Sequence, residues 1–462
     1  MEKLTAAVVL AAGDGKRMRS SRSKVCCEVL GKPMLCWVLD SCRRFGLNNE
    51  NVCAVLSGKD DGVRSLLPEN MPTVIQSERL GTGHAVMMAE SFLKEMQAKG
   101  VSDVCVLYGD VPFLNENDLM PALMLHREKG HAVTVITAVV DDPARYGRIV
   151  RTAESVKIVE AADADEAELA IKEINSGVYW FDIDYLIRAL PLLKNDNAQH
   201  EYYLTDLVGM APSLGCAAGA KCCEDASSVL GANSRRELAN LNFIAREKVF
   251  DKLYAEGVDI PCTDGVIIGP DVNIGCDTTI LPGTVITGIC NIGSGCRIGP
   301  NSHIINSDVG DGSVIESSRI ENSRLGKNVK MGPFSQIRPD CDIADSVKIG
   351  NFVEVKNSIV GEKTSLAHLT YIGDSDLGRG INVGCGVVTV NYDGQSKFRT
   401  VIGDDAFIGC NTNLIAPVKV GDGAYIAAAT TVTEDVEADA LAIGRVRQIQ
   451  KPGMAKGRIK KK

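Results

Sequence analysis

Short apolar runs alternate with segments of mixed polarity over the first 230 residues of the chain. The runs at residues 6–10, 52–56, 104–107 and 133–136 are continuous, which is typical of strands buried on both faces of a sheet. Between them, residues 34–45, 83–97 and 117–129 mix polar and apolar positions as helices do. Strands that alternate with helices predict a doubly wound α/β sheet.

A long helix is predicted after this region. No Gly or Pro occurs between Ser234 and Glu256, and the apolar residues there share one helical face: Leu238, Leu241, Ile244, Ala245, Val249 and Leu253. We therefore expect a first domain at residues 1–235 and a linker helix at residues 236–256.

The hydrophobic period then changes to six residues. A series of aliphatic residues spaced six apart begins at Ile268 and continues to Ile304, and the six-residue spacing returns at residues 331–355 and 402–432. Residues 265–444 hold 25 glycines, against 20 in the other 282 residues. A strand and a tight corner every six residues, with three faces to a coil, predict a prism-shaped parallel β-helix within residues 257–462. Spacing alone leaves its handedness open.

Composition and charge exclude several classes of protein. Apolar residues make up 45% and charged residues 24%, as in soluble globular proteins, and the net charge of -9 argues against a nucleic-acid partner. Only the tail at residues 456–462 is basic, and we interpret it as a solvated terminus. The chain shows neither a membrane span nor a signal peptide, and its 16 cysteines form no C-x-x-C pair. These features predict a cytoplasmic protein with free thiols and no membrane partner.

A Gly-rich turn follows the first apolar run directly. Gly13 and Gly15 let backbone amides approach an anion closely, and Arg17 and Lys24 can neutralise phosphate charge. The third run ends at Asp110, at the carboxyl end of a central strand, where open α/β sheets bind ligands. An aspartate in this position is equally well explained as a cap, so Asp110 alone leaves both roles open.

The six-residue rhythm is broken between Val388 and Thr400. An insertion in a solenoid forms a loop, and loops on a rigid scaffold commonly carry function. His368 lies nearby in the sequence, but taken alone it is better explained as a satisfied histidine on a coil. The insertion therefore marks a second candidate site without giving its chemistry.

Taken together, these motifs resemble the sugar-nucleotide pyrophosphorylases. The segments at residues 10–18, 76–83 and 108–110 occur in the order of that family. Further matches at residues 146–148, Glu160, Asn175 and Asn233 resemble one branch of it, the bifunctional N-acetylglucosamine-1-phosphate uridyltransferases and glucosamine-1-phosphate acetyltransferases. The resemblance covers nearly the whole chain. It implies a Rossmann-like nucleotidyltransferase domain followed by a left-handed β-helix of hexapeptide repeats.

For the first domain, the resemblance implies attack of a sugar 1-phosphate on the α-phosphorus of UTP, with release of pyrophosphate. Such transfers depend on positioning and charge neutralisation, and oxygen ligands suit Mg²⁺. The resemblance assigns the Mg²⁺ ligands to Asp110 and Asn233. It assigns contacts with the nucleotide or nucleotide sugar to Leu10, Ala11, Ala12, Gly13, Lys24, Gln76, Gly81, Thr82, Tyr108, Gly109, Asp110, Gly147, Glu160, Asn175 and Asn233. Asp14 departs from the small or basic residue that is usual there.

For the β-helix, the resemblance implies acetyl transfer from acetyl-CoA to glucosamine 1-phosphate in a homotrimer, in a pathway that feeds cell-wall synthesis. His368 is the implied general base, since imidazole titrates in the required range. The implied sugar-phosphate contacts are Arg338, Lys356, Tyr371 and Asn382, and the implied acetyl-CoA contacts are Cys385, Asn391, Tyr392, Cys410, Ala428 and Arg445. Three positions depart from the usual residues: Cys385 from alanine, Cys410 from serine and Ala429 from glycine.

Two rival interpretations remain. One is a nucleotidyltransferase whose β-helix serves only assembly or allosteric control, and the other is a noncatalytic scaffold. A purely structural solenoid has no reason to carry His368 together with Lys356 and Tyr371. Intact Lys24 and Asp110 argue in the same way against a scaffold.

Overall fold

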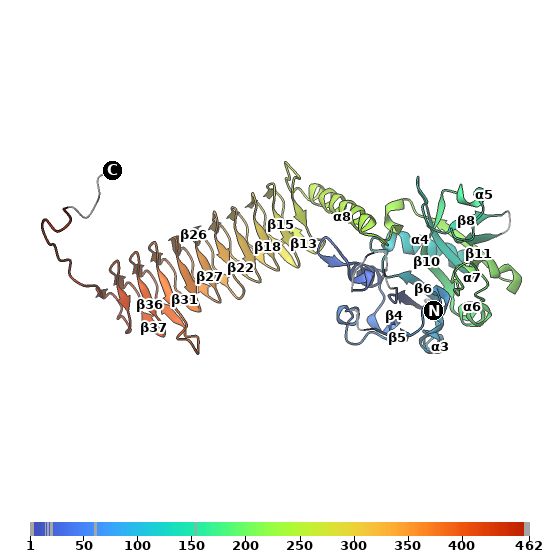
Figure 1. Cartoon of the computed structure of the whole chain (residues 1–462), viewed down its shortest axis with the longest axis horizontal. Helices are drawn as coiled ribbons and strands as arrows, with labels where there is room; N and C mark the ends of the chain where they lie inside the picture. The colour runs from blue at the N-terminus through green and yellow to red at the C-terminus, as the bar shows by residue number, and fades with distance from the viewer. Residues whose placement is uncertain are drawn as a thin grey trace. The chain divides into compact units, whose positions relative to one another are not determined.

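A computed structural model describes residues 4–13, 15, 18, 22–59, 62–152 and 155–456 (Figure 1). Asp14, Arg17 and the basic tail from residue 457 lie outside the described residues. The chain forms two compact units, Met1–Glu247 and Lys248–Lys462, and each is described by itself.

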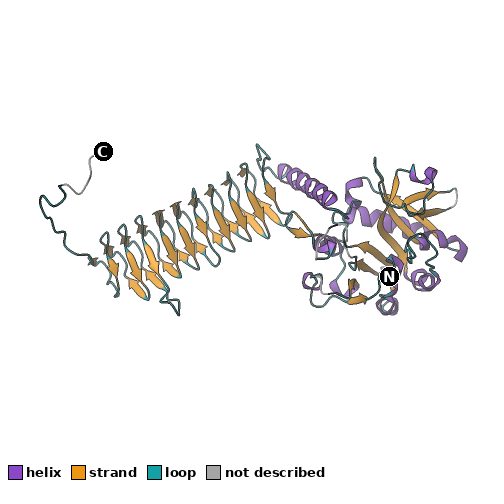
Figure 2. Ribbon diagram, viewed as in Figure 1, coloured by secondary structure: helices purple, strands orange, loops and turns teal. Residues whose placement is uncertain are grey.

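The first unit is built on a nine-stranded sheet between helices (Figure 2). The order along the sheet is β11-β7-β10-β6-β1-β4-β5, and β8 and β9 extend it beside β10. The strand bounds are β1 Leu4–Leu10, β4 Val52–Ser57, β5 Thr73–Gln76, β6 Val101–Tyr108, β7 His131–Val139, β8 Arg148–Arg151, β9 Val156–Val159, β10 Glu173–Asp182 and β11 Ala217–Cys222. A short hairpin pairs β2 Glu28–Val29 with β3 Lys32–Pro33. All four predicted strands are confirmed, and their buried side chains belong to two apolar clusters.

Strand β10 makes the sheet mixed, because it runs antiparallel to both β6 and β7. The sequence prediction did not include this strand. Its pairing with β7 shifts register between Asn175 and Tyr179, as at a β-bulge. Gly177 in this bulge has a φ of 78°, and a Cβ there would come within 2.5 Å of the Tyr108 ring. The bulge therefore requires glycine, and it lies beside the end of β6.

The predicted helices are present, with one difference. Two of them match, α1 Met34–Arg44 and α4 Glu116–Lys129, but the predicted segment 83–97 forms two helices, α2 Thr82–Met87 and α3 Glu90–Ala98. The remaining α-helices of this unit are α5 Glu166–Leu169, α6 Ile183–Ala189 and α7 Asp206–Met210.

Helix α8, Arg235–Ala255, is the predicted linker helix, and the division between the two units falls within it. In its first half, the Asn242 side chain accepts a hydrogen bond of 2.9 Å from the backbone N–H of Leu30 in the first unit. Near its C-terminal end, Phe250 and Leu253 belong to the buried core of the β-helix. No helix among the described residues has both the length and the apolar character to cross a bilayer.

The second unit is the predicted β-helix, built from three parallel sheets of ten, nine and ten strands. It extends from β12 Ile267–Ile268 to β40 Leu441–Ala442, and strand n pairs with strand n+3 over most of its length. Ile268, Ile286 and Ile304 lie in register in successive coils and are fully buried. The residues spaced six apart thus form the apolar ladders inside a left-handed parallel β-helix.

The interruption of the rhythm is a loop, as predicted. Residues 391–399 leave the coil between β33 Val388–Val390 and β34 Thr400–Ile402. An antiparallel bridge between Tyr392 and Lys397 narrows the base of this loop. The site residues of this unit lie in or beside β24 Gln336–Ile337, β26 Lys348–Asn351, β27 Glu354–Lys356, β29 Ser365–His368, β30 Tyr371–Gly373, β32 Asn382–Val383, β33, β35 Phe407–Ile408 and β38 Tyr425–Ile426, and Arg445 follows β40.

Candidate functional sites

A cleft of about 610 Å³ opens at the carboxyl ends of β1, β5 and β6 in the first unit. This is the edge of an open α/β sheet where ligands bind. The residues that line the cleft are Leu10, Ala12, Gly13, Gly15, Lys24, Gln76, Arg79, Gly81, Thr82, Ala85, Tyr108, Asp110, Glu201 and Asn233. Most residues of the predicted nucleotide site are thus gathered in one cavity.

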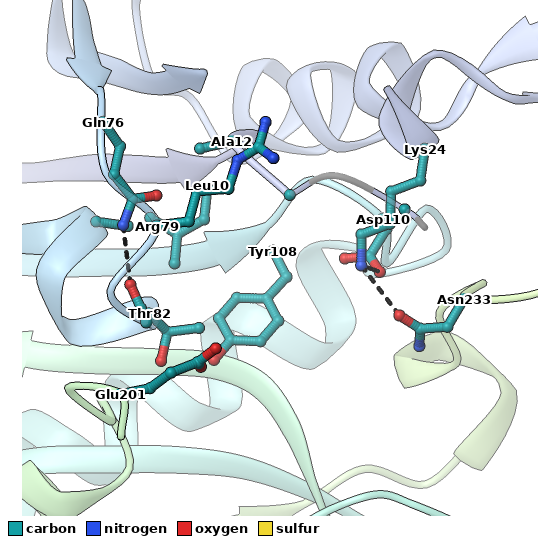
Figure 3. Close-up of a pocket in the computed structure, with 14 residues that line it drawn as sticks. Leu10, Ala12, Lys24, Gln76, Arg79, Thr82, Tyr108, Asp110, Glu201 and Asn233 are labelled. Atoms are coloured by element: carbon teal, nitrogen blue, oxygen red, sulfur yellow. Dashed lines mark hydrogen bonds and ion pairs between the residues drawn. The ribbon is translucent and has the colours of Figure 1, made fainter. Parts of the chain in front are cut away.

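Three polar side chains meet on one side of this cleft (Figure 3). The ammonium of Lys24 lies 2.5 Å from Asp110 Oδ2 and 3.1 Å from Asn233 Oδ1. Lys24 begins a short 3-10 helix at residues 24–26, Asp110 follows β6 and Asn233 precedes α8, so the fold brings together positions that are far apart in the sequence. Asp110 is only 6% exposed, and its charge is therefore little screened by water.

The Gly-rich turn lets the Lys24 side chain approach closely. Gly15 has a φ of 56°, and a Cβ at this position would come within 2.7 Å of Lys24 Cβ. Any larger residue would therefore combine a strained backbone with a clash against Lys24. A Cβ on Gly13 would lie 3.3 Å from Lys24 Cε, so the alkyl chain of Lys24 runs along the turn.

The opposite side of the cleft carries Gln76 and the segment 81–83 (Figure 3). Gln76 is buried, and its Nε2 donates a hydrogen bond of 3.0 Å to the carbonyl of Gly81. The Thr82 hydroxyl accepts from the backbone N–H of Leu204 at 3.1 Å, and Gly83 N–H donates to the carbonyl of Tyr202 at 2.7 Å. Hydrogen bonds therefore hold the segment 81–83, which includes the predicted nucleotide-contacting residues Gly81 and Thr82, at both ends.

A second cavity of about 230 Å³ adjoins the first and shares Lys24, Thr82, Tyr108, Asp110, Glu201 and Asn233 with it. Its other walls include Gly147, Glu160 and Asn175, which belong to the predicted set of contacts with the nucleotide or nucleotide sugar. The Oδ1 atom of Asn175 accepts from Gly177 N–H and from the Tyr179 hydroxyl, both at 3.0 Å. The β10 bulge thus fixes the orientation of the Asn175 amide at the edge of this cavity.

Burial changes the acidity of the groups around the second cavity. Desolvation raises the pKa of Glu160, and the charges of Asp206, Asp163 and Glu201 raise it further against the hydrogen bond from Thr205. Desolvation also raises the pKa of Tyr108, which remains a neutral hydroxyl. Such a pocket favours hydrogen bonding with uncharged hydroxyl groups, which are the groups that a sugar offers.

Two other residues of the predicted set, Ala11 and Gly109, make backbone hydrogen bonds just beyond the ends of β1 and β6. Ala11 N–H donates to the carbonyl of Val55 at 2.9 Å, and Gly109 N–H donates to the carbonyl of Leu10 at 3.0 Å. Arg79, Glu201 and Tyr203 line the cavities but were missed in the sequence analysis. No spacing or motif distinguished them from ordinary surface residues.

In the β-helix, five residues lie above one another at one corner of successive coils. Asn351 pairs with His368 in the register of β26 and β29. Counting on from the neighbouring strand pairs places Cys385, Cys410 and Ala428 in the same column. Arg445 closes the series, since its Nη1 donates to the carbonyl of Ala428 at 2.9 Å. The predicted base and most of the predicted acetyl-CoA residues therefore form a continuous ladder.

His368 is exposed at this corner, and its ring is held by one neighbour. Its Nδ1 lies 2.5 Å from Asn351 Oδ1, and an amide oxygen can only accept, so Nδ1 carries the proton. The other nitrogen, Nε2, is then the basic atom. Cys410 and Asn382 are also exposed, and Cys385 is half-buried.

A cluster of cations lies one strand further along the same coils. The pKa of Lys356 is lowered. The largest cause is its side-chain contact with Lys397, followed by desolvation and by the charge of Lys397. Arg338 is paired with Glu354 at 2.9 Å, and Glu354 lies in register with Tyr371. Two ammonium groups held against each other form a site for an anion such as a phosphate. Lys397, in the inserted loop, was not among the predicted site residues.

The loop is tied down by a ladder of Asn357, Asp374 and Asn391. The amides of Asn357 and Asn391 both donate to the carboxylate of Asp374, the first at 2.5 Å. Asn391 is 9% exposed and is thus engaged by Asp374, while Tyr392 is 56% exposed. Of the two loop residues predicted to bind acetyl-CoA, only Tyr392 therefore stands open to solvent.

Comparisons with known proteins match both units. A nucleotidyl transferase model matches residues 6–220, a GlmU-like C-terminal hexapeptide model matches residues 298–379, and a bacterial transferase hexapeptide (six repeats) model matches residues 399–434. The bifunctional protein GlmU of Fervidobacterium nodosum is 47% identical over 97% of this chain and 96% of its own. The chain belongs to the GlmU family.

Two further GlmU proteins are similar over nearly their whole lengths. That of Caldanaerobacter subterraneus subsp. tengcongensis is 46% identical over 100% of this chain and 99% of its own, and that of Acetivibrio thermocellus is 43% identical over 96% and 95%. Membership of the GlmU family makes the chain both a nucleotidyltransferase and an acetyltransferase. The resemblance seen in the motifs is confirmed, and both rival interpretations are set aside.

Proposed function

We propose that the cleft of the first unit carries uridyl transfer and that the corner ladder of the β-helix carries acetyl transfer. As a GlmU protein, the chain acts in the synthesis of UDP-N-acetylglucosamine. The β-helix would acetylate glucosamine 1-phosphate, and the first unit would then join the product to UMP from UTP. This assigns residues 1–235 and 257–462 to separate reactions, with the helix at 236–256 between them.

The observation that carries the uridyl site is the meeting of Lys24, Asp110 and Asn233 where the two cavities join. The larger cavity, with Gln76 and Gly81 at its far side, suits the nucleotide. The smaller cavity, with Glu160 and Asn175, suits the sugar. The oxygen of the sugar phosphate and the α-phosphorus of UTP would thus meet beside Lys24, whose positive charge offsets the phosphate charge.

The same cluster supports the Mg²⁺ proposal. The oxygens of Asp110 and Asn233 converge on one positive charge, the Lys24 ammonium, and a carboxylate with an amide oxygen is a donor set that suits Mg²⁺. Bound there, Mg²⁺ would neutralise charge on the triphosphate and the departing pyrophosphate. Lys24 and the backbone around Gly13 would hold the phosphates in line.

For acetyl transfer, Lys356 and Lys397 would bind the phosphate of glucosamine 1-phosphate, beside Arg338, Tyr371 and Asn382. His368 Nε2 would accept a proton from the sugar amine, which then attacks the thioester carbonyl of acetyl-CoA. Asn351 holds the tautomer that leaves Nε2 basic. The C–N bond forms, the C–S bond breaks and coenzyme A leaves as a thiol. Cys385, Cys410, Ala428 and Arg445 would line the path of the cofactor.

We further propose a cytoplasmic homotrimer that assembles through the β-helix, with its product supplied to cell-wall synthesis. Hexapeptide repeats favour such assembly, and the exposure of His368 and Cys410 supports it. A corner that is open to water gains a closed cofactor cleft when a second prism packs beside it.

A two-stage assay tests the proposal. Glucosamine 1-phosphate and acetyl-CoA are supplied first, UTP and Mg²⁺ second, and N-acetylglucosamine 1-phosphate and UDP-N-acetylglucosamine are followed by mass spectrometry. We expect each product to appear only after its own substrates are added. UDP-glucosamine formed from unacetylated sugar at a comparable rate would contradict the proposed order.

A further inference from the structure

Lys24 occupies the space between the two proposed Mg²⁺ ligands. Its ammonium is within hydrogen-bond distance of Asp110 Oδ2 and of Asn233 Oδ1, at 2.5 and 3.1 Å. A divalent cation that bound these two oxygens would sit about 2 Å from each. An ammonium and a metal ion cannot both fill that space. We infer that Lys24 is the resident cation of the nucleotide-free site and must be drawn away before the metal binds, a conclusion that rests on the proposed Mg²⁺ role.

The charge balance of the cluster points the same way. Asp110 supplies one negative charge, and Lys24 cancels it in a partly buried place where the two side chains are 8% and 19% exposed. A dication added beside the ammonium would therefore meet a repulsion that water screens only in part. A triphosphate reverses this balance, because its oxygens give the ammonium a new partner and give the metal additional ligands.

The Gly-rich turn provides the route for this exchange. The alkyl chain of Lys24 runs along Gly13 and Gly15, and both glycines line the cavity proposed for the nucleotide. Rotation of the Lys24 side chain can therefore move the ammonium from Asp110 towards phosphates that are bound at the turn. Metal and nucleotide would then bind with positive coupling, and this coupling must be reciprocal.

Direct metal binding tests this inference without any turnover. Mn²⁺ serves as the probe, and its affinity for the full-length, nucleotide-free protein is measured by the EPR signal of free Mn²⁺. We expect Lys24→Met to bind Mn²⁺ at least about tenfold tighter than the unmodified protein, because the competing charge is gone. Lys24→Arg keeps the charge and is expected to bind Mn²⁺ weakly.

Arg79→Met is the matched control, since Arg79 lines the same cavity on the side of Gln76 (Figure 3). It removes an equal charge away from the two ligands, so we expect less than a twofold gain in affinity. A gain as large as that of Lys24→Met would show a general field effect and would overturn the inference. Lys24→Gln provides a second neutral variant if thermal melting shows that Lys24→Met does not fold.

Asp110→Asn separates the proposed metal role of Asp110 from the inference that Lys24 is the resident cation. We expect it to abolish Mn²⁺ binding, both alone and combined with Lys24→Met. If Asp110→Asn leaves Mn²⁺ affinity unchanged, the proposed metal role of Asp110 is wrong. If it abolishes binding while the neutral Lys24 variants bind Mn²⁺ no tighter than the unmodified protein, the metal site stands and the resident-cation inference is wrong.

Discussion

Asp110 lies within a cleft of about 610 Å³ and is 6% exposed, whereas His368 is an exposed residue at the corner of a solenoid. In the first site, Lys24 meets Asp110, which is 86 residues further along the chain, and Asn233, which is 209 residues further along. The ladder of the second site takes Asn351 and His368 from adjacent coils, 17 residues apart. A cleft made by a whole sheet supplies its own shielding from water, while a ladder supplies order and depends on another surface for shielding.

The largest expected effect separates the two sites completely. Asp110→Ala removes the only carboxylate of the proposed metal cluster, so we expect uridyl transfer to fall below detection. We expect acetyl transfer to stay near that of the unmodified enzyme, because its proposed residues all lie in the other unit. The two activities are measured separately on the same preparation. Equal loss of both in a folded protein would contradict the two-site assignment.

His368→Ala is the converse change. Loss of a general base typically lowers a rate by ~10² to 10⁴, and we expect acetyl transfer at neutral pH to fall within this range. Much of the loss should be recovered as the pH rises, because the sugar amine then loses its proton to solvent. Initial rates of acetylation across the alkaline range provide the measurement. Unchanged acetylation at neutral pH would remove His368 from the mechanism.

Mixing inactive subunits tests whether the exposed ladder is completed by a neighbour. One variant carries His368→Ala and the other carries Arg445→Ala. If the base and the cofactor contact come from different chains, mixed trimers regain part of the acetyltransferase activity, whereas each variant alone stays inactive. Light scattering gives the assembly state. A fully active monomer at the assay concentration would refute the proposed trimer.

The acidity of Asp374 predicts how the stability of the β-helix depends on pH. Burial favours the neutral acid, but the hydrogen bonds from Asn357 and Asn391 and the charges of Lys356 and Lys397 outweigh it and lower the pKa below the usual 3.8. The stabilisation from this carboxylate is thus present above the unfolded pKa and is lost as the pH falls through the folded value. We expect Asp374→Asn to destabilise the fold by about 1 to 3 kcal/mol at pH 7.

The matching measurement is a series of denaturant melts of both proteins from pH 7 downwards. The difference between them should begin to shrink as the pH falls below the usual pKa of 3.8, and it should be lost below the lowered pKa of the folded protein. A difference that is independent of pH would show that Asp374 acts through its shape rather than its charge. Ser375→Ala, in the next position, serves as a control because it leaves the carboxylate in place.

The smallest expected effect concerns Cys410, where the family usually has serine. A hydroxyl is a better hydrogen-bond partner than a thiol, and one such bond is worth about 0.5 to 1.5 kcal/mol. We therefore expect Cys410→Ser to raise kcat/KM for acetyl-CoA by about two- to tenfold. Uridyl transfer by the same protein is the internal control. A lower kcat/KM would show that the thiol is the better fit in this cleft.

The two regions also differ in how far the sequence predicts them. The period of six predicts the inward ladder over residues 268–304, 331–355 and 402–432, because each coil there repeats the same local geometry. It does not predict Val309 and Ile320, which are buried in the same core at spacings of five. In the α/β unit the sequence predicts the long central strands β1, β4, β6 and β7 and the main helices. Antiparallel β10 was missed, because Asn175, Ser176 and Gly177 interrupt its apolar run.

The residues of the two sites also differ in how far the sequence predicts them. Lys24 and Asp110 could be singled out because a Gly-rich turn and a strand end mark them, but their contact with Asn233 depends on the packing of distant segments. Lys397 and Asp374 were missed for a different reason. Their roles arise from the side chains they meet across coils, Lys356 in one case and Asn391 in the other, and the inserted loop shifts the count between those coils.

The in-register coils also make the β-helix a spacer with a fixed unit of length. None of the proposed acetyl-transfer residues precedes Arg338. The strands from β12 to β23 Lys330–Met331 therefore support the site but contribute no residue to it. Gain or loss of one whole coil in that stretch would move the ladder along the axis by about 4.8 Å, the spacing between paired strands. A change of another length keeps the register of the later coils only where the extra residues leave the coil as a loop, as residues 391–399 do. Variation in this part of the chain is therefore expected as whole coils or as loops at the corners.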